Sequence, residues 1–150
     1  MKHPAPNPNG TSAGHWKAAA EGRLALPHCA ACGRFRWPMR AACPDCSGEL
    51  TWRDASGRGV IASWGVVHRA VNPELKDAAP YVVAFVELDE RVRLFTNIVN
   101  MAPETLRVGL RVRVCFDAAL DAAIQIPVFV VDSELDAQAG GATLSRSGSE

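Results

Sequence analysis

The chain has 150 residues, a mean hydropathy of −0.01 and a balanced charge of 16 acidic and 16 basic side chains. This length suits one ordinary domain or two small ones. The neutral balance, with a pI near 6.9, gives no overall attraction to nucleic acid, and no apolar stretch is long enough to cross a membrane. We therefore expect a cytoplasmic protein with no membrane partner.

Both ends of the chain have the composition of disordered segments. Residues 1–14 are rich in Pro, Asn and Gly, and residues 134–150 in Gly, Ser and Ala. Neither end can bury enough apolar surface to offset the entropy lost on ordering. We predict a disordered segment at 1–14, a helix and metal ribbon at 15–53, a β-barrel at 54–133 and a disordered tail at 134–150.

The first expected element is a short helix over residues 15–24. Its alanines favour helix, and Gly22 is suited to end it. Trp16, Ala19 and Ala20 are spaced to form one apolar stripe. Because so short a helix is marginal by itself, the stripe must pack on something. It either covers the chain's own domain or, through Trp16, docks on a partner protein.

Four cysteines follow as two Cys-x-x-Cys pairs: Cys29 with Cys32, and Cys43 with Cys46. Two such knuckles supply the four thiolates of a tetrahedral zinc site. Disulfides would suit a secreted domain, but no apolar run of signal-peptide length follows Met1. A rubredoxin-like iron site is an alternative, although rubredoxins have a longer loop between their knuckles. Since four thiolates leave no open coordination position, we predict one structural zinc.

Beyond a turn-rich joint the pattern changes to strands. Five runs are rich in β-branched or aromatic residues and bounded by turn residues: Val60–His68, Tyr81–Leu88, Arg93–Asn100, Arg111–Phe116 and Pro127–Val131. A helical turn at 101–106 separates the third run from the fourth. The fold class is therefore mainly β, with a short N-terminal helix, a rubredoxin-like zinc ribbon and a five-stranded OB-fold barrel. A sandwich fragment is the alternative.

The pattern does not supply a self-sufficient active site. Cys115 is the only cysteine outside the knuckles, and we expect it to face the core of its strand. The chain has no Gly-x-Ser-x-Gly elbow and no phosphate-binding glycine loop. His68 and Arg69 end the first barrel strand, where they are either solvated or line a ligand or partner surface. We predict that the chain is not catalytic alone.

Together these motifs resemble the family called domain of unknown function thirty-five. The resemblance rests on Trp16 with the following Glu-Gly-Arg-Leu, the first knuckle with Gly33, Pro38-x-Arg40, the second knuckle and the barrel runs, and it covers about residues 15–132. Two departures are Met39, where the family often has a second proline, and residues 90–92, where many relatives carry a glycine. Neither departure touches the cysteines.

The resemblance implies a role beside an acyl-CoA enzyme. Family members are commonly subunits of, or fused to, thiolase-like enzymes and hotdog-fold enoyl-CoA hydratases. It thus implies a non-catalytic zinc-containing subunit that docks on such an enzyme, with a thiolase-like partner favoured and Trp16 as a docking residue. The alternatives are a hotdog-fold hydratase partner or a free-standing acyl-CoA-binding protein.

The segment between the knuckles is where a coenzyme A thioester would bind. Arginine forks bind phosphate, and aromatic faces stack on adenine. The candidate residues are Arg36 and Arg40 for phosphate, Phe35 and Trp37 for stacking, and His68 with Arg69 at the strand end. Alternatively, the two rings only close the ribbon onto the barrel. The same segment would serve a nucleic-acid-binding module, which the neutral charge disfavours.

Overall fold

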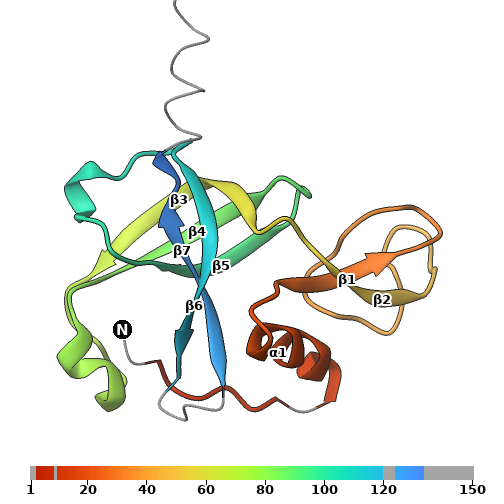
Figure 1. The fold of residues 1–150 in the computed structure, drawn as a ribbon, viewed down its shortest axis with the longest axis horizontal. Helices are drawn as coiled ribbons and strands as arrows, with labels where there is room; N and C mark the ends of the chain where they lie inside the picture. The colour runs from red at the N-terminus through yellow and green to blue at the C-terminus, as the bar shows by residue number, and fades with distance from the viewer. Residues whose placement is uncertain (1–2, 9, 120–123, 134–150) are drawn as a thin grey trace, which may run out of the picture.

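The computed structural model describes residues 3–8, 10–119 and 124–133. A 3₁₀ turn (Gly10–Ser12) leads into helix α1 (Ala13–Ala20), and an antiparallel pair follows, β1 (Ala25–Cys29) with β2 (Leu50–Asp54). The remaining strands form a closed barrel: β3 (Arg58–Val67), β4 (Tyr81–Leu88), β5 (Arg93–Ile98), β6 (Arg111–Ala118) and β7 (Gln125–Val131). Figure 1 shows the barrel and the β1–β2 ribbon side by side, with α1 next to both.

The barrel has the order β3-β4-β5-β7-β6, which confirms the predicted five-stranded OB-fold. Its neighbours are antiparallel except β5 and β7, which run parallel and share one register pair, Ile98 with Phe129. Two further contacts hold these strands: Val99 donates to the Phe129 carbonyl at 2.9 Å, and the Thr96 hydroxyl donates to the Pro127 carbonyl at 3.2 Å. The β5–β7 contact is therefore a short seam in the barrel wall.

Alternation along the strands sets what lies inside the barrel. In β4 every second residue is buried, namely Val82, Ala84, Val86 and Leu88. Period-two alternation of this kind is expected for strands with one face on a core. Phe129 of β7 is fully buried in the same cluster.

The ribbon and the barrel share this core. Leu24 and Leu26, which flank the start of β1, belong to the same buried cluster as the barrel residues, and Phe35 packs against it. The backbone joins the two parts as well, because the Ala55 N–H donates to the Leu24 carbonyl at 2.8 Å. The ribbon therefore packs on the barrel through this cluster, while Cys29, Cys43 and Leu50 form a second buried cluster inside the ribbon.

Helix α1 buries a different face from the predicted one. His15, Ala18 and Ala19 are buried, whereas Trp16 is half-buried and the last residue of the helix is exposed. The reason is a polar contact that spacing alone does not reveal: His15 Nδ1–H donates to the Ala25 carbonyl at 2.9 Å. Because this bond holds His15 inward, the buried stripe of the helix is shifted by one residue from the predicted stripe. Helix α1 packs on β1 and β7.

Two 3₁₀ elements lie in the barrel loops. The predicted helical turn is a 3₁₀ turn at Pro103–Thr105, and the loop between β3 and β4 holds an unpredicted one at Pro73–Ala78. The predicted C-terminal tail lies outside the described residues. In the N-terminal segment, His3 is buried and bridges to Ala119. Within the described ranges no helix has the length and apolar character to span a bilayer.

Candidate metal centre and ligand surfaces

The two cysteine knuckles are built alike. In each knuckle, the carbonyl of the first cysteine accepts a hydrogen bond from the backbone N–H four residues later. The N–H of the same cysteine donates to the backbone carbonyl five residues later. The bonds are Gly33 to Cys29 at 2.8 Å, Cys29 to Arg34 at 3.0 Å, Ser47 to Cys43 at 2.8 Å and Cys43 to Gly48 at 2.8 Å. Two equivalent turns thus present their sulfurs toward one point.

The sulfurs are spaced for a metal and not for disulfides. Cys29 Sγ lies 3.5 Å from Cys46 Sγ, Cys32 Sγ lies 3.7 Å from Cys43 Sγ, and all four sulfurs lie within 4.8 Å of one another. A bonded pair would be about 2.05 Å apart. Tetrahedral zinc, with Zn–S bonds of about 2.3 Å, needs sulfurs about 3.8 Å apart. The donor set therefore fits zinc held by four cysteines.

Backbone amides favour the ionised thiols that a metal requires. The Cys32 N–H lowers the pKa of Cys29, and the Asp45 N–H is the main cause that lowers the pKa of Cys43 to about 6. The Gly48 N–H acts in the same direction on Cys46, but hydrogen bonds to the neighbouring cysteines, together with burial, outweigh it and raise the pKa of Cys46 to about 12. A divalent cation would take the place of the protons that these closely spaced thiols share.

Arg36 lies against the metal centre. Its guanidinium pairs with Asp45 and donates to the Phe35 carbonyl at 2.9 Å, beside the thiols of Cys43 and Cys32. Its Nε is buried and has no hydrogen-bond partner among the described atoms. A cation with a spare donor at this position suits the net negative charge of a zinc–tetrathiolate centre.

The aromatic residues of the ribbon face the helix and the barrel. The Trp37 ring centroid lies 4.8 Å from that of His15, and Phe35 lies edge-on to His28 with centroids 4.9 Å apart. Trp37 remains 38% exposed and shares with Trp16 a groove of about 170 Å³ that β5 and β7 complete. The rings therefore close the ribbon onto the barrel and also leave an apolar groove.

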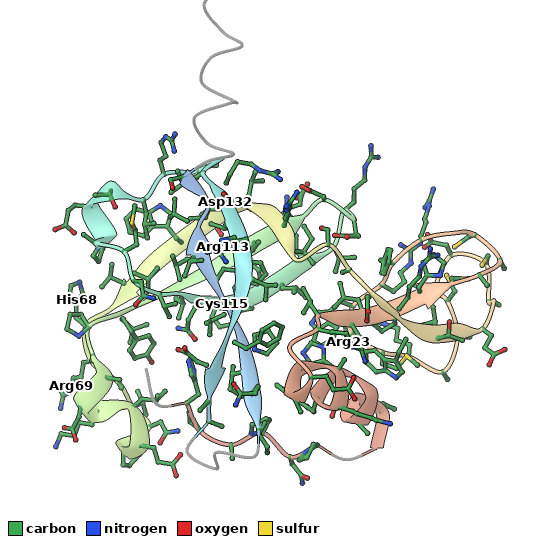
Figure 2. All side chains as sticks on the ribbon, in the orientation of Figure 1. Arg23, His68, Arg69, Arg113, Cys115 and Asp132 are labelled. Carbon is green, nitrogen blue, oxygen red and sulfur yellow. The ribbon has the colours of Figure 1, made fainter. Side chains whose placement is uncertain are left out.

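The six candidate coenzyme A residues do not form one site. Arg36, Trp37, Phe35 and Arg40 belong to the ribbon. His68 and Arg69 lie at the opposite end of the molecule, past the end of β3, as Figure 2 shows. They line a separate hollow of about 390 Å³ in the β3–β4 loop.

The prediction that Cys115 faces the core is wrong. Val112, Val114 and Phe116 of β6 pack into or against the core cluster, so Cys115 lies on the outer face of the strand with Arg113 and is half-buried. Burial raises the pKa of the Cys115 thiol, and the nearby Asp117 carboxylate raises it further. A thiol of raised pKa is a poor nucleophile at neutral pH.

The sequence analysis did not identify an exposed pair of aromatic residues on the barrel. Phe85 of β4 and Phe95 of β5 are 46% and 66% exposed, with ring centroids 5.2 Å apart on the outer barrel face. Phe85 occupies the outward position between buried Ala84 and Val86, so strict alternation of β4 would have identified it. Phe95 also lines the groove beside Trp37.

Comparison with known proteins assigns both parts of the molecule. Residues 16–51 match the model of the ChsH2 rubredoxin-like zinc ribbon domain, and residues 52–117 match that of the ChsH2 C-terminal OB-fold domain. A solved structure, the Ltp2–ChsH2(DUF35) aldolase, matches at 36% identity and a TM-score of 0.76 over 85% of this chain and 98% of that one. A DUF35-family structure from Sulfolobus solfataricus, at 15% identity and a TM-score of 0.56, shares the fold.

Two relatives match at the sequence level. A DUF35 domain-containing scaffold protein of Methanothermobacter thermautotrophicus is 40% identical over 90 residues, which are 59% of this chain and 67% of the relative. A probable enoyl-CoA hydratase alpha subunit of Thermomonospora curvata is 38% identical over 128 residues, or 84% of this chain. The chain spans only 39% of that relative's length.

The fold and the cysteine centre define a class of protein in which a zinc ribbon is packed on an OB-fold barrel. Within that class the chain belongs to the DUF35 family, as the sequence motifs predicted.

Proposed function

We propose that the chain is a non-catalytic accessory subunit of an acyl-CoA-processing enzyme, with a thiolase-like partner and one structural zinc. The observation that carries this proposal is the match to the Ltp2–ChsH2(DUF35) aldolase, in which this chain covers 98% of the compared chain at 36% identity. Relatives this similar commonly keep the same mode of assembly. The partner would supply the reacting groups, and this chain would supply docking and part of the acyl-CoA site.

The groove between ribbon and barrel is the docking surface that best suits this role. Trp16 and Trp37 form one wall, and Phe95 on β5 continues the apolar surface over the barrel. Exposed aromatic residues that border an apolar groove are typical anchors of protein–protein interfaces. The interface role predicted for Trp16 remains part of this proposal.

A hotdog-fold hydratase partner is the second candidate. The relative from Thermomonospora curvata, a probable enoyl-CoA hydratase alpha subunit, favours it at 38% identity. Both candidates place the chain beside an enzyme that acts on a CoA thioester. They differ in the partner fold, which the experiment below identifies.

Besides the segment between the knuckles, nucleic-acid binding draws support from the exposed Phe85–Phe95 pair, since OB-folds use the corresponding strands to bind oligonucleotides. The charges around this pair do not suit a polyanion. Arg93 pairs with Glu87 at 2.8 Å, and Arg111 pairs with Asp89 at 2.9 Å.

The test is a pull-down of the tagged full-length chain from its native host, with mass spectrometry of partners and metal analysis. We expect a thiolase-like protein and about one zinc per chain. Recovery of a hotdog-fold protein would favour the second candidate, whereas nucleic acid or no partner would contradict the proposal. The Cys43→Ser variant should lose zinc and partner together, and normal assembly of that variant would exclude a structural role for the metal.

A further inference from the structure

The four cysteines of the metal centre differ in how far solvent reaches them. Cys29 and Cys43 are buried, with 0% and 2% of their surface exposed, and Cys32 is half-buried, whereas Cys46 is exposed. Oxidation of a cysteine depends on its thiolate character and its exposure. Coordination to zinc deprotonates a thiol outright, so all four sulfurs are thiolates in the zinc-bound protein. Exposure therefore decides between them, and Cys46 is the cysteine that an oxidant reaches first.

A second cysteine is placed to react with an oxidised Cys46. Cys46 Sγ lies 3.5 Å from Cys29 Sγ, and Cys32 Sγ lies 3.7 Å from Cys43 Sγ, so each of these pairs joins the two knuckles. The Arg36 guanidinium lies beside the second pair. Because a disulfide bond is about 2.05 Å long, the sulfurs of Cys29 and Cys46 need to approach by about 1.5 Å to form one.

Gly48 leaves the Cys29–Cys46 pair uncovered on one side. A Cβ at this position would lie 2.9 Å from Cys29 Sγ and 3.3 Å from Cys46 Sγ, so the backbone passes close to both sulfurs without a side chain over them. Gly48 is itself only half-buried. A small oxidant such as hydrogen peroxide therefore has a way to this pair.

The metal centre also supports the groove between the ribbon and the barrel. Phe35 and Trp37 lie in the segment between the two knuckles. Phe35 packs against the barrel core, and Trp37 borders the groove. Loss of the metal would free the two ends of this segment, so the groove would lose one wall.

We propose that Cys46 is a peroxide-reactive site, at which oxidation joins Cys46 to Cys29 and releases the zinc. The Cys46 thiolate attacks one oxygen of hydrogen peroxide, the O–O bond breaks and hydroxide leaves, which oxidises the sulfur to a sulfenic acid. The Cys29 thiolate then attacks this sulfur, the S–O bond breaks and a second hydroxide leaves. The two sulfurs lose two electrons, and peroxide gains them. Cys32 and Cys43 alone no longer complete the tetrahedral donor set.

The experiment treats the zinc-loaded full-length chain with one equivalent of hydrogen peroxide. A chromogenic chelator follows zinc release, and mass spectrometry of unreduced peptides maps the disulfides. We expect release of about one zinc per peroxide consumed, a Cys29–Cys46 disulfide, and recovery of zinc binding after reduction.

Two variants test the assignment to Cys46. Cys46→His keeps three thiolates and one imidazole, a donor set that zinc accepts. Measured against its own rate without peroxide, this variant should lose zinc to peroxide about tenfold more slowly than the wild type. Cys115→Ala is the matched control, because it removes the cysteine outside the knuckles, and it should behave like the wild type.

Other outcomes would overturn the inference. A disulfide within one knuckle, first oxidation at another cysteine, or equally fast release from Cys46→His would each contradict the role of Cys46. If that variant binds no zinc, the disulfide map of the wild type decides. The inference rests on the zinc of the proposed function and not on its partner. A chain that binds no zinc would overturn both, whereas a loaded chain that keeps its zinc in peroxide would overturn this inference alone.

Discussion

Arg36 shows how one side chain can serve a metal centre without being a ligand. Its guanidinium lies beside two thiols with a buried Nε that lacks a partner. Replacing it with Met should speed zinc loss, because second-layer partners typically change metal affinity by about tenfold or more. The rate at which a chromogenic chelator takes zinc from the Arg36→Met variant measures this.

Arg34 provides the matched control for that experiment. It pairs with the same Asp45 carboxylate at 2.9 Å, but its side chain is 67% exposed. An Arg34→Met variant should therefore release zinc at nearly the wild-type rate. Equal acceleration in both variants would trace the effect to Asp45 and contradict a direct role for Arg36.

Ser47 occupies a backbone conformation that favours glycine. Its φ is 59°, and the equivalent residue of the other knuckle, Gly33, has φ 70°. Left-handed geometry costs a residue with a side chain about 1 kcal/mol. Ser47→Gly should raise the free energy of unfolding of the zinc-bound protein by about 0.5–1 kcal/mol, as measured by denaturant titration. A destabilised Ser47→Gly variant would show that the serine side chain makes a compensating contact.

Single residues also show what the sequence could and could not predict. The four metal ligands follow from spacing alone, because two knuckles contain all the needed geometry. The outward position of Cys115 was readable from the parity of Val112, Val114 and Phe116, and was misassigned. The pairing of Arg36 with Asp45 depends on how the second knuckle folds back, which spacing does not specify.

At the level of elements, helix α1 is fixed by a histidine that must stay neutral. Burial lowers the pKa of His15 from its usual 6.5, and the hydrogen bond to the Ala25 carbonyl offsets this only in part. The unfolded chain therefore takes up the proton first as the pH falls. The contribution of neutral His15 to the free energy of unfolding is therefore fully present above the unfolded pKa of about 6.5. It is lost as the pH falls from there through the lower pKa of the folded protein.

The corresponding prediction is a pH-dependent difference between two proteins. The melting temperature of the zinc-bound wild type should fall more steeply between pH 7.5 and 5.5 than that of a His15→Gln variant. Protonation of the cysteine ligands affects both proteins alike, and His3, whose pKa burial also lowers, gives both a residual slope. Parallel curves would mean that His15 has the same pKa in the folded and the unfolded protein.

The strands were predictable and the helix face was not, for a physical reason. A strand with one buried face repeats every two residues, so five runs sufficed to place the barrel. A helix of eight residues has only two turns, and several apolar stripes fit it equally well. One hydrogen bond from His15 then decides between them.

For the whole molecule, the shared core predicts that removing the metal lowers the stability of the ribbon and of the barrel. Leu24 and Leu26 bring the ribbon into the barrel cluster, so loss of zinc should loosen both parts. We expect chelation to lower the melting temperature and leave one transition, with coincident curves from tryptophan fluorescence and far-UV circular dichroism. A barrel that melts at the same temperature with and without metal would show that the two parts are independent.

The placement of the candidate ligand residues at opposite ends belongs to this scale as well. Only β2 and β3 lie between Arg36 and His68 in the sequence, and nothing in this spacing reveals how far apart the fold places the two residues. The closure of β3 against β4 and β6 sets that separation. Sequence motifs thus predicted the candidate ligand residues, and the strand pairing determined which of these residues lie close enough to act together.

The narrow contact between β5 and β7 has a mechanical consequence. A barrel closed at one side by a single register pair is a rolled sheet that can unroll along that line. The β5–β7 contact lies beneath the groove that Trp16 and Trp37 border, so a protein bound in the groove would hold the two strands together. Amide hydrogens of Arg93–Ile98 should then exchange fastest in the barrel of the free chain and slow most on assembly.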